Sequence, residues 1–199
     1  MNAPLPLEEP VAARDYLRWL RNRADGVRRE LVDGRVVTMN AERVRHSAVK
    51  LDVAVELRRA IGARDLDCTV FGDGATVVTD ESNACEPDAT VQCGGDWDPD
   101  ALVLERPVII VEVLSPTTES RDTGSKLVGY LGLDSVRHYL LADTVRRTLV
   151  HHAKADDGTI ATRIARDGAL ALDPPGIEID VAACFASLSG RDARDRPRG

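Results

Sequence analysis

Residues 107–116 read PVIIVEVLSP, and this stretch decides the fold class. Six apolar residues, most of them β-branched, surround a single glutamate, Glu112, before a Ser-Pro step ends the run. A continuous apolar run of this length is typical of a central strand covered on both faces. Glu112 is the anomaly, because a buried carboxylate without a partner is costly. Either an arginine or a backbone group pairs with Glu112, or the carboxylate is a metal ligand.

The segments on either side of this strand predict the rest of the fold. A hairpin is indicated where Asp33-Gly34 separates two short apolar runs. Apolar periodicity predicts helices, and alternating or continuous apolar runs predict strands. The expected elements are a helix at 14–24, the hairpin at 28–39, a helix at 42–61, strands at 68–71, 75–78 and 86–91, a helix at 120–133, strands at 138–143, 148–152 and 159–165, and a short helix after Asp180.

Together these elements predict an α/β fold, with a mixed central β-sheet flanked by helices and an early β-hairpin. The helix at 42–61 carries two neighbouring apolar stripes, so we expect it to be mostly buried. The stripes are Val44, Ala48, Leu51 and Val55, and beside them Val49, Val53, Leu57 and Ile61. We expect a flexible N-terminal segment at 1–13, one domain at 14–188 and a disordered charged tail at 189–199.

Composition and targeting signals indicate an ordinary globular protein of the cytoplasm. The chain has 199 residues, of which 43% are hydrophobic and 30% are charged. No apolar stretch approaches the length of a membrane span, and the N-terminus lacks the features of a signal peptide. The cysteines show no zinc spacing, so we expect reduced, structural thiols at Cys68, Cys85, Cys93 and Cys184.

The distribution of charge leaves two interpretations open. The net charge of −7 argues against a protein that coats nucleic acid, although an enzyme that grips a short stretch remains possible. Residues 65–105 contain eleven acidic residues and no lysine or arginine, whereas residues 14–35 contain seven arginines. The first interpretation is a solvated helix face plus an acidic loop. The second is a phosphate-contacting edge beside a metal-binding one.

Three residues form the candidate chemical site. Asp88 follows a proline at the start of a strand, Glu112 lies near the end of the central strand, and Lys126 lies on the following helix. Alone, Asp88 is typical of a turn and Lys126 of a solvated helix face. Together, two carboxylates suit a hard divalent cation, and a lysine nearby could stabilise the charge that grows on a phosphate.

The order and spacing of these residues resemble the PD-(D/E)XK nuclease superfamily, and within it the bacterial Uma-type restriction endonuclease family. The resemblance covers about residues 14–188. No single piece is specific, but their combination is. The matching pieces are Glu30-Leu31-Val32-Asp33-Gly34, His46, Glu86-Pro87-Asp88, Pro107 to Pro116, Arg121-Asp122, Lys126, Tyr130 and Leu141-Ala142-Asp143.

The resemblance implies a metal-dependent nuclease site. Asp88 and Glu112 would bind Mg²⁺ or Mn²⁺, and Glu30 would lie near them as a further ligand or base. The chain departs from the superfamily pattern at Leu114, where the motif lysine is expected. The family pattern implies that Lys126 takes over the role of that lysine. His46 is a further possible site residue, either contacting phosphate, bonding Glu30, or simply flanking its helix.

The resulting hypothesis is an endonuclease that uses a divalent metal to hydrolyse phosphodiester bonds in DNA. Its partner would be DNA, and the resemblance suggests a possible homodimer. A catalytically inactive module of the same fold, binding DNA or a protein partner, is the alternative that Leu114 and the acidic charge favour. A metal-dependent hydrolase of another substrate is a third possibility. Since no phosphate-binding glycine motif is present, nucleotide binding has no motif support.

Overall fold

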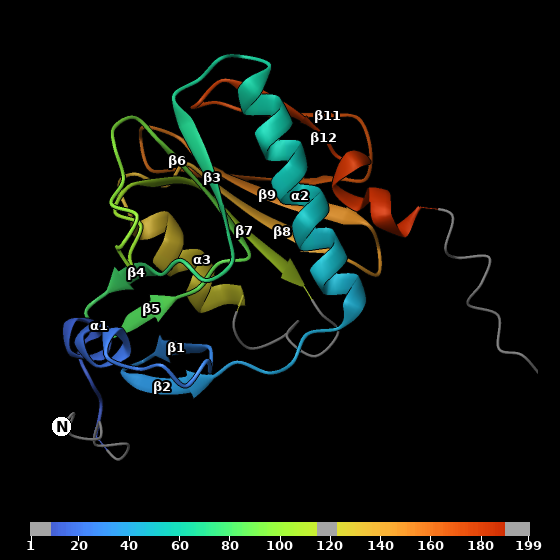
Figure 1. Cartoon of the computed structure of the whole chain (residues 1–199). Helices are drawn as coiled ribbons and strands as arrows, with labels where there is room; N and C mark the ends of the chain where they lie inside the picture. The colour runs from blue at the N-terminus through green and yellow to red at the C-terminus, as the bar shows by residue number, and fades with distance from the viewer. Residues whose placement is uncertain (1–8, 115–122, 190–199) are drawn as a thin grey trace, which may run out of the picture.

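The computed structural model describes residues 9–114 and 123–189. The first eight residues of the expected flexible segment, the start of the helix expected at 120–133 and the tail beyond Ser189 lie outside these ranges. Within them the fold is mixed α/β, with a large mixed sheet, few helices and an early antiparallel hairpin (Figure 1). The fold class and the early hairpin that the sequence predicted are therefore confirmed.

A six-stranded sheet forms the centre of the molecule. Its central pair, β7 and β8, is parallel, and every other neighbouring pair is antiparallel. In spatial order the strands are β10 (Ile160–Ala165), β9 (Thr148–Lys154), β8 (His138–Asp143), β7 (Pro107–Leu114), β6 (Ala89–Cys93) and β3 (Cys68–Gly72). The apolar run at 107–114 is thus an interior strand, as expected.

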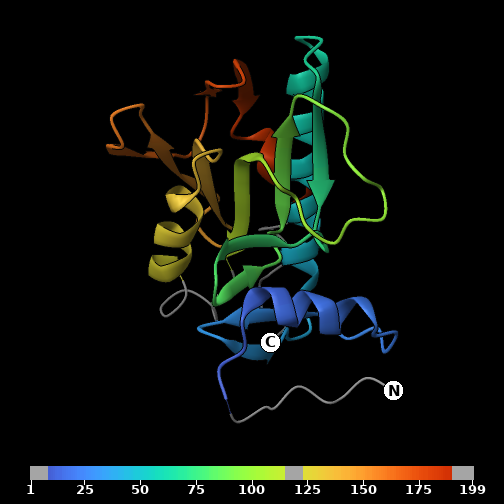
Figure 2. The ribbon, with the colours of Figure 1, turned by 90° about the vertical axis from the view of Figure 1, so that its left-hand side faces the viewer.

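Helices cover both faces of this sheet, as Figures 1 and 2 show. One face packs against α2 (Val44–Gly62), the 3-10 helix η1 (Ala183–Leu188) and a small hairpin of β11 (Ala169–Leu172) and β12 (Ile177–Asp180). The other packs against α3 (Thr123–Gly132). Side chains alternate along a strand. Ile109, Val111 and Val113 of β7 therefore enter the α2 core, whereas Ile110 and Glu112 face α3.

A second, smaller sheet lies below the large one in Figure 1. It contains the predicted hairpin of β1 (Arg29–Val32) and β2 (Arg35–Thr38), followed by β5 (Asn83–Cys85) and β4 (Val77–Asp80), and it packs against α1 (Ala13–Arg21). Asp33 and Gly34 both have positive φ, at 48° and 72°, as a type I′ turn requires. A side chain at Gly34 would also collide with Pro10, since a Cβ there would lie 2.8 Å from the Pro10 Cβ.

The prediction for the helix at 42–61 was right about its existence and wrong about one stripe. Val49, Val53 and Leu57 are completely buried against the sheet. Val44, Leu51 and Val55, from the stripe that was also expected to be buried, face solvent. The two stripes lie on opposite sides of the helix rather than beside each other, so the sheet covers one of them and leaves the other exposed.

Three further expectations about local structure were wrong or incomplete. Cys68 and Cys93 form a disulfide between paired residues of β3 and β6, so these two thiols are not reduced; Cys85 and Cys184 are free and buried, as expected. The strands expected at 68–71 and 75–78 correspond to β3 and β4, which belong to different sheets although they are adjacent in the sequence. The strands β11 and β12 were not predicted.

In the described part of the chain, no helix is long and apolar enough to cross a membrane.

Candidate active site

One cavity of about 330 Å³ lies where the carboxyl end of β7 meets the small sheet, α2 and α3. The carboxyl ends of strands are a common place for ligand sites in α/β sheets. All five residues singled out from the sequence line this cavity, and they come from five separate parts of the chain. They are Glu30 on β1, His46 on α2, Asp88 just before β6, Glu112 on β7 and Lys126 on α3.

Asp88 is held in place by both the backbone and a lysine. Its N–H donates to the Val111 carbonyl at 3.0 Å, and its Oδ2 accepts from the Val113 N–H at 2.6 Å. Its Oδ1 lies 2.8 Å from the Nζ of Lys50, one turn beyond His46 on α2. Only 6% of the side chain is exposed. Asp88 is therefore fixed beside the central strand rather than being a solvated turn residue.

Glu112 belongs to a second group of contacts on the α3 side. Its Oε1 lies 3.1 Å from Lys126 Nζ and accepts a hydrogen bond from the Tyr130 hydroxyl at 2.8 Å. The same Lys126 Nζ lies 3.1 Å from Glu30 Oε1, which also accepts from the Glu86 N–H at 2.9 Å. Lys126 and Tyr130 reach one carboxylate because residues four apart share a helix face. Lys126 therefore lies between two carboxylates, and only 12% of its side chain is exposed.

Burial raises the pKa of Glu112 to about 7. The Lys126 ammonium and the Tyr130 hydroxyl oppose this shift, whereas the nearby charges of Asp88 and Glu30 add to it. Desolvation disfavours a charged carboxylate, and additional negative charges disfavour it further. Burial, with a smaller contribution from the neighbouring carboxylates, thus outweighs the Lys126 ammonium. A site of this kind favours a cation.

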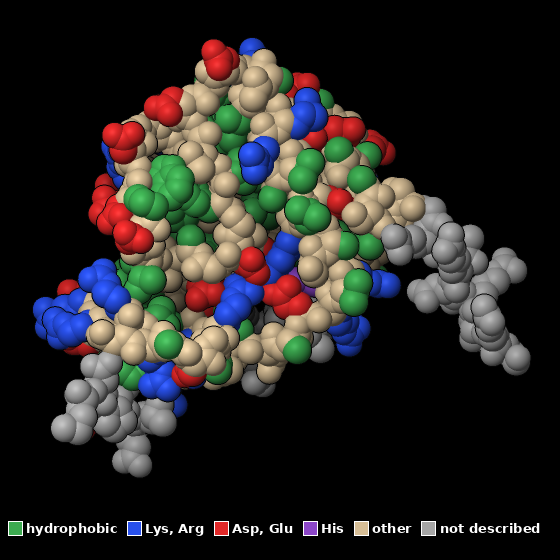
Figure 3. All heavy atoms as spheres, in the orientation of Figure 1, with side chains coloured by type: hydrophobic (Ala, Val, Ile, Leu, Met, Phe, Trp, Pro, Cys, Tyr) green, Lys and Arg blue, Asp and Glu red, His purple; other side chains and the backbone are tan. Residues whose placement is uncertain are grey.

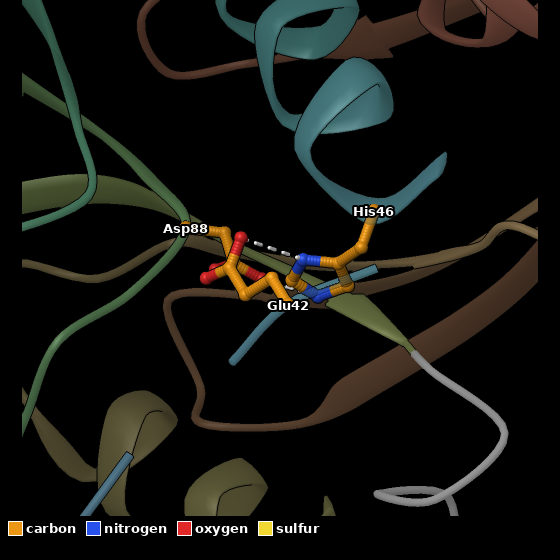
Figure 4. A group of neighbouring side chains, drawn as sticks. All are labelled: Glu42, His46 and Asp88. Carbon is orange, nitrogen blue, oxygen red and sulfur yellow. Dashed lines mark hydrogen bonds and ion pairs between the residues drawn. The ribbon is translucent and has the colours of Figure 1, made fainter. Parts of the chain in front are cut away.

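A third group of contacts joins α2 to Asp88. His46 Nε2 donates to the Val113 carbonyl at 2.6 Å and lies 3.6 Å from Asp88 Oδ2, while Nδ1 lies 3.3 Å from Glu42 Oε2. Figure 4 shows Glu42, His46 and Asp88 pointing toward one another. One ligand atom from each lies within 4.8 Å of the other two, which suits a shared metal ion. His46 therefore contacts Val113, Asp88 and Glu42 rather than Glu30, and it lies within the site rather than on a solvated flank of α2.

Lys50 links this group to the surrounding surface. Its ammonium contacts Glu42, lies 3.0 Å from Asp73 and 2.8 Å from Asp88, and these three carboxylates outweigh burial and raise its pKa. Arg28 extends the network by pairing with Asp73 at 2.7 Å and Glu86 at 3.0 Å. Figure 3 shows acidic, basic and histidine side chains gathered together between the large sheet and the hairpin.

The sequence prediction missed Glu42, Lys50 and Asp73 as members of the site. A signal for one of them was present, because His46 and Lys50 are four residues apart and so share one side of α2, whereas Glu42 lies just before the helix begins. Asp73 carried no such signal, since it follows β3 in a tight turn and reaches Lys50 only through the tertiary fold. Leu114, the departure from the expected motif, also lines the cavity. Ser115 and Asp122 lie outside the described residues.

Comparisons with known proteins agree with this architecture. Residues 13–183 match the model of the Uma2 family, described as "Putative restriction endonuclease". "Uncharacterized protein slr1290" of Synechocystis sp. (strain ATCC 27184 / PCC 6803 / Kazusa) is 26% identical over 157 residues, which are 79% of this chain and 80% of that protein.

A solved structure is similar as well. It is a crystal structure of "a putative nuclease belonging to DUF820" from Anabaena variabilis ATCC 29413, with a TM-score of 0.67 and 15% sequence identity. The similarity covers 90% of this chain and 99% of that one. At this identity the likeness shows a shared fold. Because the family match spans most of the sequence, this chain belongs to the Uma2 family.

Proposed function

We propose that this protein is a divalent-metal-dependent endonuclease that hydrolyses phosphodiester bonds in DNA. The observation that carries the proposal is the convergence of Glu30, Asp88, Glu112 and Lys126 on one cavity. Membership of a family described as "Putative restriction endonuclease" supports the reaction class. Phosphodiester hydrolysis forms a bond between a water oxygen and phosphorus and breaks the bond from phosphorus to one sugar oxygen.

The donor set of the cavity fits Mg²⁺ or Mn²⁺. Hard divalent cations take carboxylate and carbonyl oxygens, and imidazole is a further acceptable ligand for Mn²⁺. Asp88 and Glu112 would hold the cation, with Glu30 completing the ligand set, because all three line the cavity. Glu42 and His46 offer further donors on the α2 side, where one ligand atom from each lies within 4.8 Å of Asp88. A bound cation would supply Lewis-acid stabilisation of the phosphate and make a coordinated water easier to deprotonate.

The chain's own residues would position and stabilise the reacting groups. Lys126 Nζ, now between Glu30 and Glu112, can donate to a non-bridging phosphate oxygen or orient the attacking water. The superfamily pattern expects a lysine two residues after Glu112, where this chain has Leu114. Lys126 on α3 would take over the role of that lysine. Tyr130 would fix the Glu112 carboxylate, and His46 would fix the Val113 carbonyl, through the hydrogen bonds they already donate.

Nicking of supercoiled plasmid in Mg²⁺, in Mn²⁺ and in a chelator tests this function. We expect metal-dependent nicking by the wild type and by Glu105→Gln, an exposed glutamate of the acidic loop. Glu112→Gln, which removes the charge and keeps the shape, should be inactive. If both glutamate variants nick equally well, the cavity is not the active site.

A catalytically inactive module that binds DNA or a protein partner is the second candidate. The specific observation that favours it is the apolar Leu114 in the cavity, together with the net charge of −7. This candidate predicts metal binding that Glu112→Gln weakens, and no nicking by the wild type on any plasmid, linear duplex or single strand.

A further inference from the structure

Helix α2 carries apolar side chains on two opposite sides. The inner side packs on the sheet, with Val49, Val53 and Leu57 fully buried. The outer side presents a stripe formed by Val44, Ala48, Leu51 and Val55, which we call the outer stripe. Val44 is 87% exposed, Leu51 65% and Val55 57%, and Ala48 is partly exposed. A row of exposed apolar side chains along one helix face, unlike scattered ones, is suited to an interaction surface.

The spacing of the outer stripe suits pairing with another helix. Its members follow one another by four, three and four residues, the repeat by which helices pack along a coiled-coil seam. The stripe is also symmetric about the midpoint between Val49 and Lys50. An antiparallel copy of the helix would place Val44 against Val55 of the partner subunit and Ala48 against Leu51 of the partner subunit. A large side chain would thus meet a small one at the centre, which permits close packing.

Charges beside the outer stripe match the same antiparallel arrangement. Arg45 and Asp52 are seven residues apart, so at about 100° per residue they flank the stripe on the same side. Antiparallel pairing brings Arg45 close to Asp52 of the partner subunit, and the twofold symmetry repeats this pair. The Asp52 carboxylate is already oriented, since it accepts hydrogen bonds from the Ser187 backbone N–H at 2.8 Å and Ser187 Oγ at 2.7 Å. Arg45 is exposed and available for the contact.

We propose that the outer stripe of α2 binds the outer stripe of a second copy of this chain, in an antiparallel, twofold-symmetric homodimer. His46 and Lys50 point to the inner side of α2, so the candidate active sites of both copies would remain accessible. Residues 190–199 contain no valine, leucine, isoleucine, methionine or aromatic residue, so the C-terminal segment has no side chains suited to covering the stripe. This inference does not rest on the proposed nuclease function.

The first test is a dilution series of the full-length protein by sedimentation equilibrium. We expect a concentration-dependent dimer, and a dissociation constant at least about 100-fold higher for Leu51→Glu, because each dimer would bury two charges at the centre of its contact. Ile164→Glu is the matched control, since Ile164 is 68% exposed on the edge strand β10 and should leave the dimer unchanged. Circular dichroism checks that both variants fold. A wild-type monomer throughout the series, or equal dissociation constants for all three proteins, would overturn the proposal.

The second test fixes the orientation of the two helices. In the antiparallel arrangement, the double variant Val44→Cys/Val55→Cys places a cysteine of each copy opposite one of the other, so mild oxidation should give a covalent dimer. Val44→Cys alone should not, because the two introduced cysteines would be about 16 Å apart along the paired helices at 1.5 Å per residue. Covalent dimers formed as readily by the single variant would mean a parallel pairing or random collision. If the wild type forms no dimer and α2 instead binds another protein or DNA, the proposal is wrong and the outer stripe serves that partner.

Discussion

The parallel strands β7 and β8 each carry a buried polar group at opposite ends of the sheet, and the two are stabilised in different ways. Near the carboxyl end of β7, Glu112 lies among carboxylates and lysines and faces a cavity. Near the amino end of β8, His138 accepts a hydrogen bond at Nδ1 from His151 Nε2 and donates from Nε2 to the Pro174 carbonyl, both at 2.9 Å. His138 is 4% exposed and His151 is 6% exposed.

The two regions show how differently a protein can bury ionisable side chains. Burial lowers the pKa of His138, and burial together with the neighbouring histidines lowers that of His151 to about 4, so this pair is neutral at pH 7 and its hydrogen bonds are made within the protein. In the Glu112 region burial raises the pKa of Glu112 to about 7, but the carboxyl group lies beside the Lys126 ammonium and faces a cavity. A closed, neutral pair stabilises the fold, whereas charged groups around a cavity cost stability and suit a ligand. We therefore expect mutations in the two regions to affect different properties.

The largest effect should come from the Asp88→Asn substitution. Losing one carboxylate should weaken Mn²⁺ binding by at least about 100-fold, beyond the roughly 10–100-fold typical of groups that only support a ligand. Isothermal calorimetry measures the affinity, and nicking should become undetectable. Asp100→Asn, in the exposed acidic loop, is the control and should bind Mn²⁺ as the wild type does. Equal affinities of the two variants would exclude Asp88 as a ligand.

Lys126→Met should lower the nicking rate by roughly 100-fold or more, the usual consequence of removing one group that stabilises transition-state charge. Metal affinity should remain, because Lys126 is not a ligand in this account. Lys154→Met is the matched control, since Lys154 donates to the Leu131 and Leu133 carbonyls at the far end of α3. Single-turnover nicking at saturating metal measures both rates. A normal rate for Lys126→Met would show that the motif lysine has not moved to this position.

His151→Gln should affect stability instead of activity. Replacing the ring disrupts a buried hydrogen bond and its packing against His138, which should cost about 2 kcal/mol of unfolding free energy. Urea denaturation measures the loss. Nicking at temperatures where the variant is folded should match the wild type, and a large loss of rate there would contradict the division between the two regions.

The smallest effect should be a pH dependence of stability. Because the folded state holds the pKa values of His138 and His151 below that of an unfolded histidine, the unfolded chain binds more protons below about pH 6.5. The stability that the neutral pair contributes is present above that pH and is lost as the pH falls toward 4. We expect wild type to lose on the order of 1 kcal/mol more than His151→Gln between pH 7 and pH 4.5. Urea titrations of both proteins at the two pH values measure this difference. If both proteins lose the same unfolding free energy, the histidine pair is not the source of the pH dependence.

Much of this arrangement could be predicted from the sequence because it depends on local patterns. The run at 107–114 indicated an interior strand, Asp33-Gly34 fixed the hairpin, and Glu112 stood out as a charge among apolar residues. The family resemblance added Glu30 and gave Lys126 the role of the motif lysine, and both residues line the same cavity. Their chemical roles remain predictions.

The parts that failed depend on which segments meet in space. Cys68 and Cys93 become neighbours only through the register between β3 and β6, which the sequence does not reveal. The two stripes of α2 are equally apolar, so composition could not show that one of them stays exposed. The pairing of His138 with His151 likewise follows from the register between β8 and β9.

The nicking rate and the unfolding free energy of Glu112→Gln and His151→Gln, each measured beside the wild type, would separate the two regions. We expect Glu112→Gln to lose nicking and keep its stability, and His151→Gln to lose stability and keep nicking. A Glu112→Gln variant that is folded, binds metal and nicks at the wild-type rate would contradict this expectation.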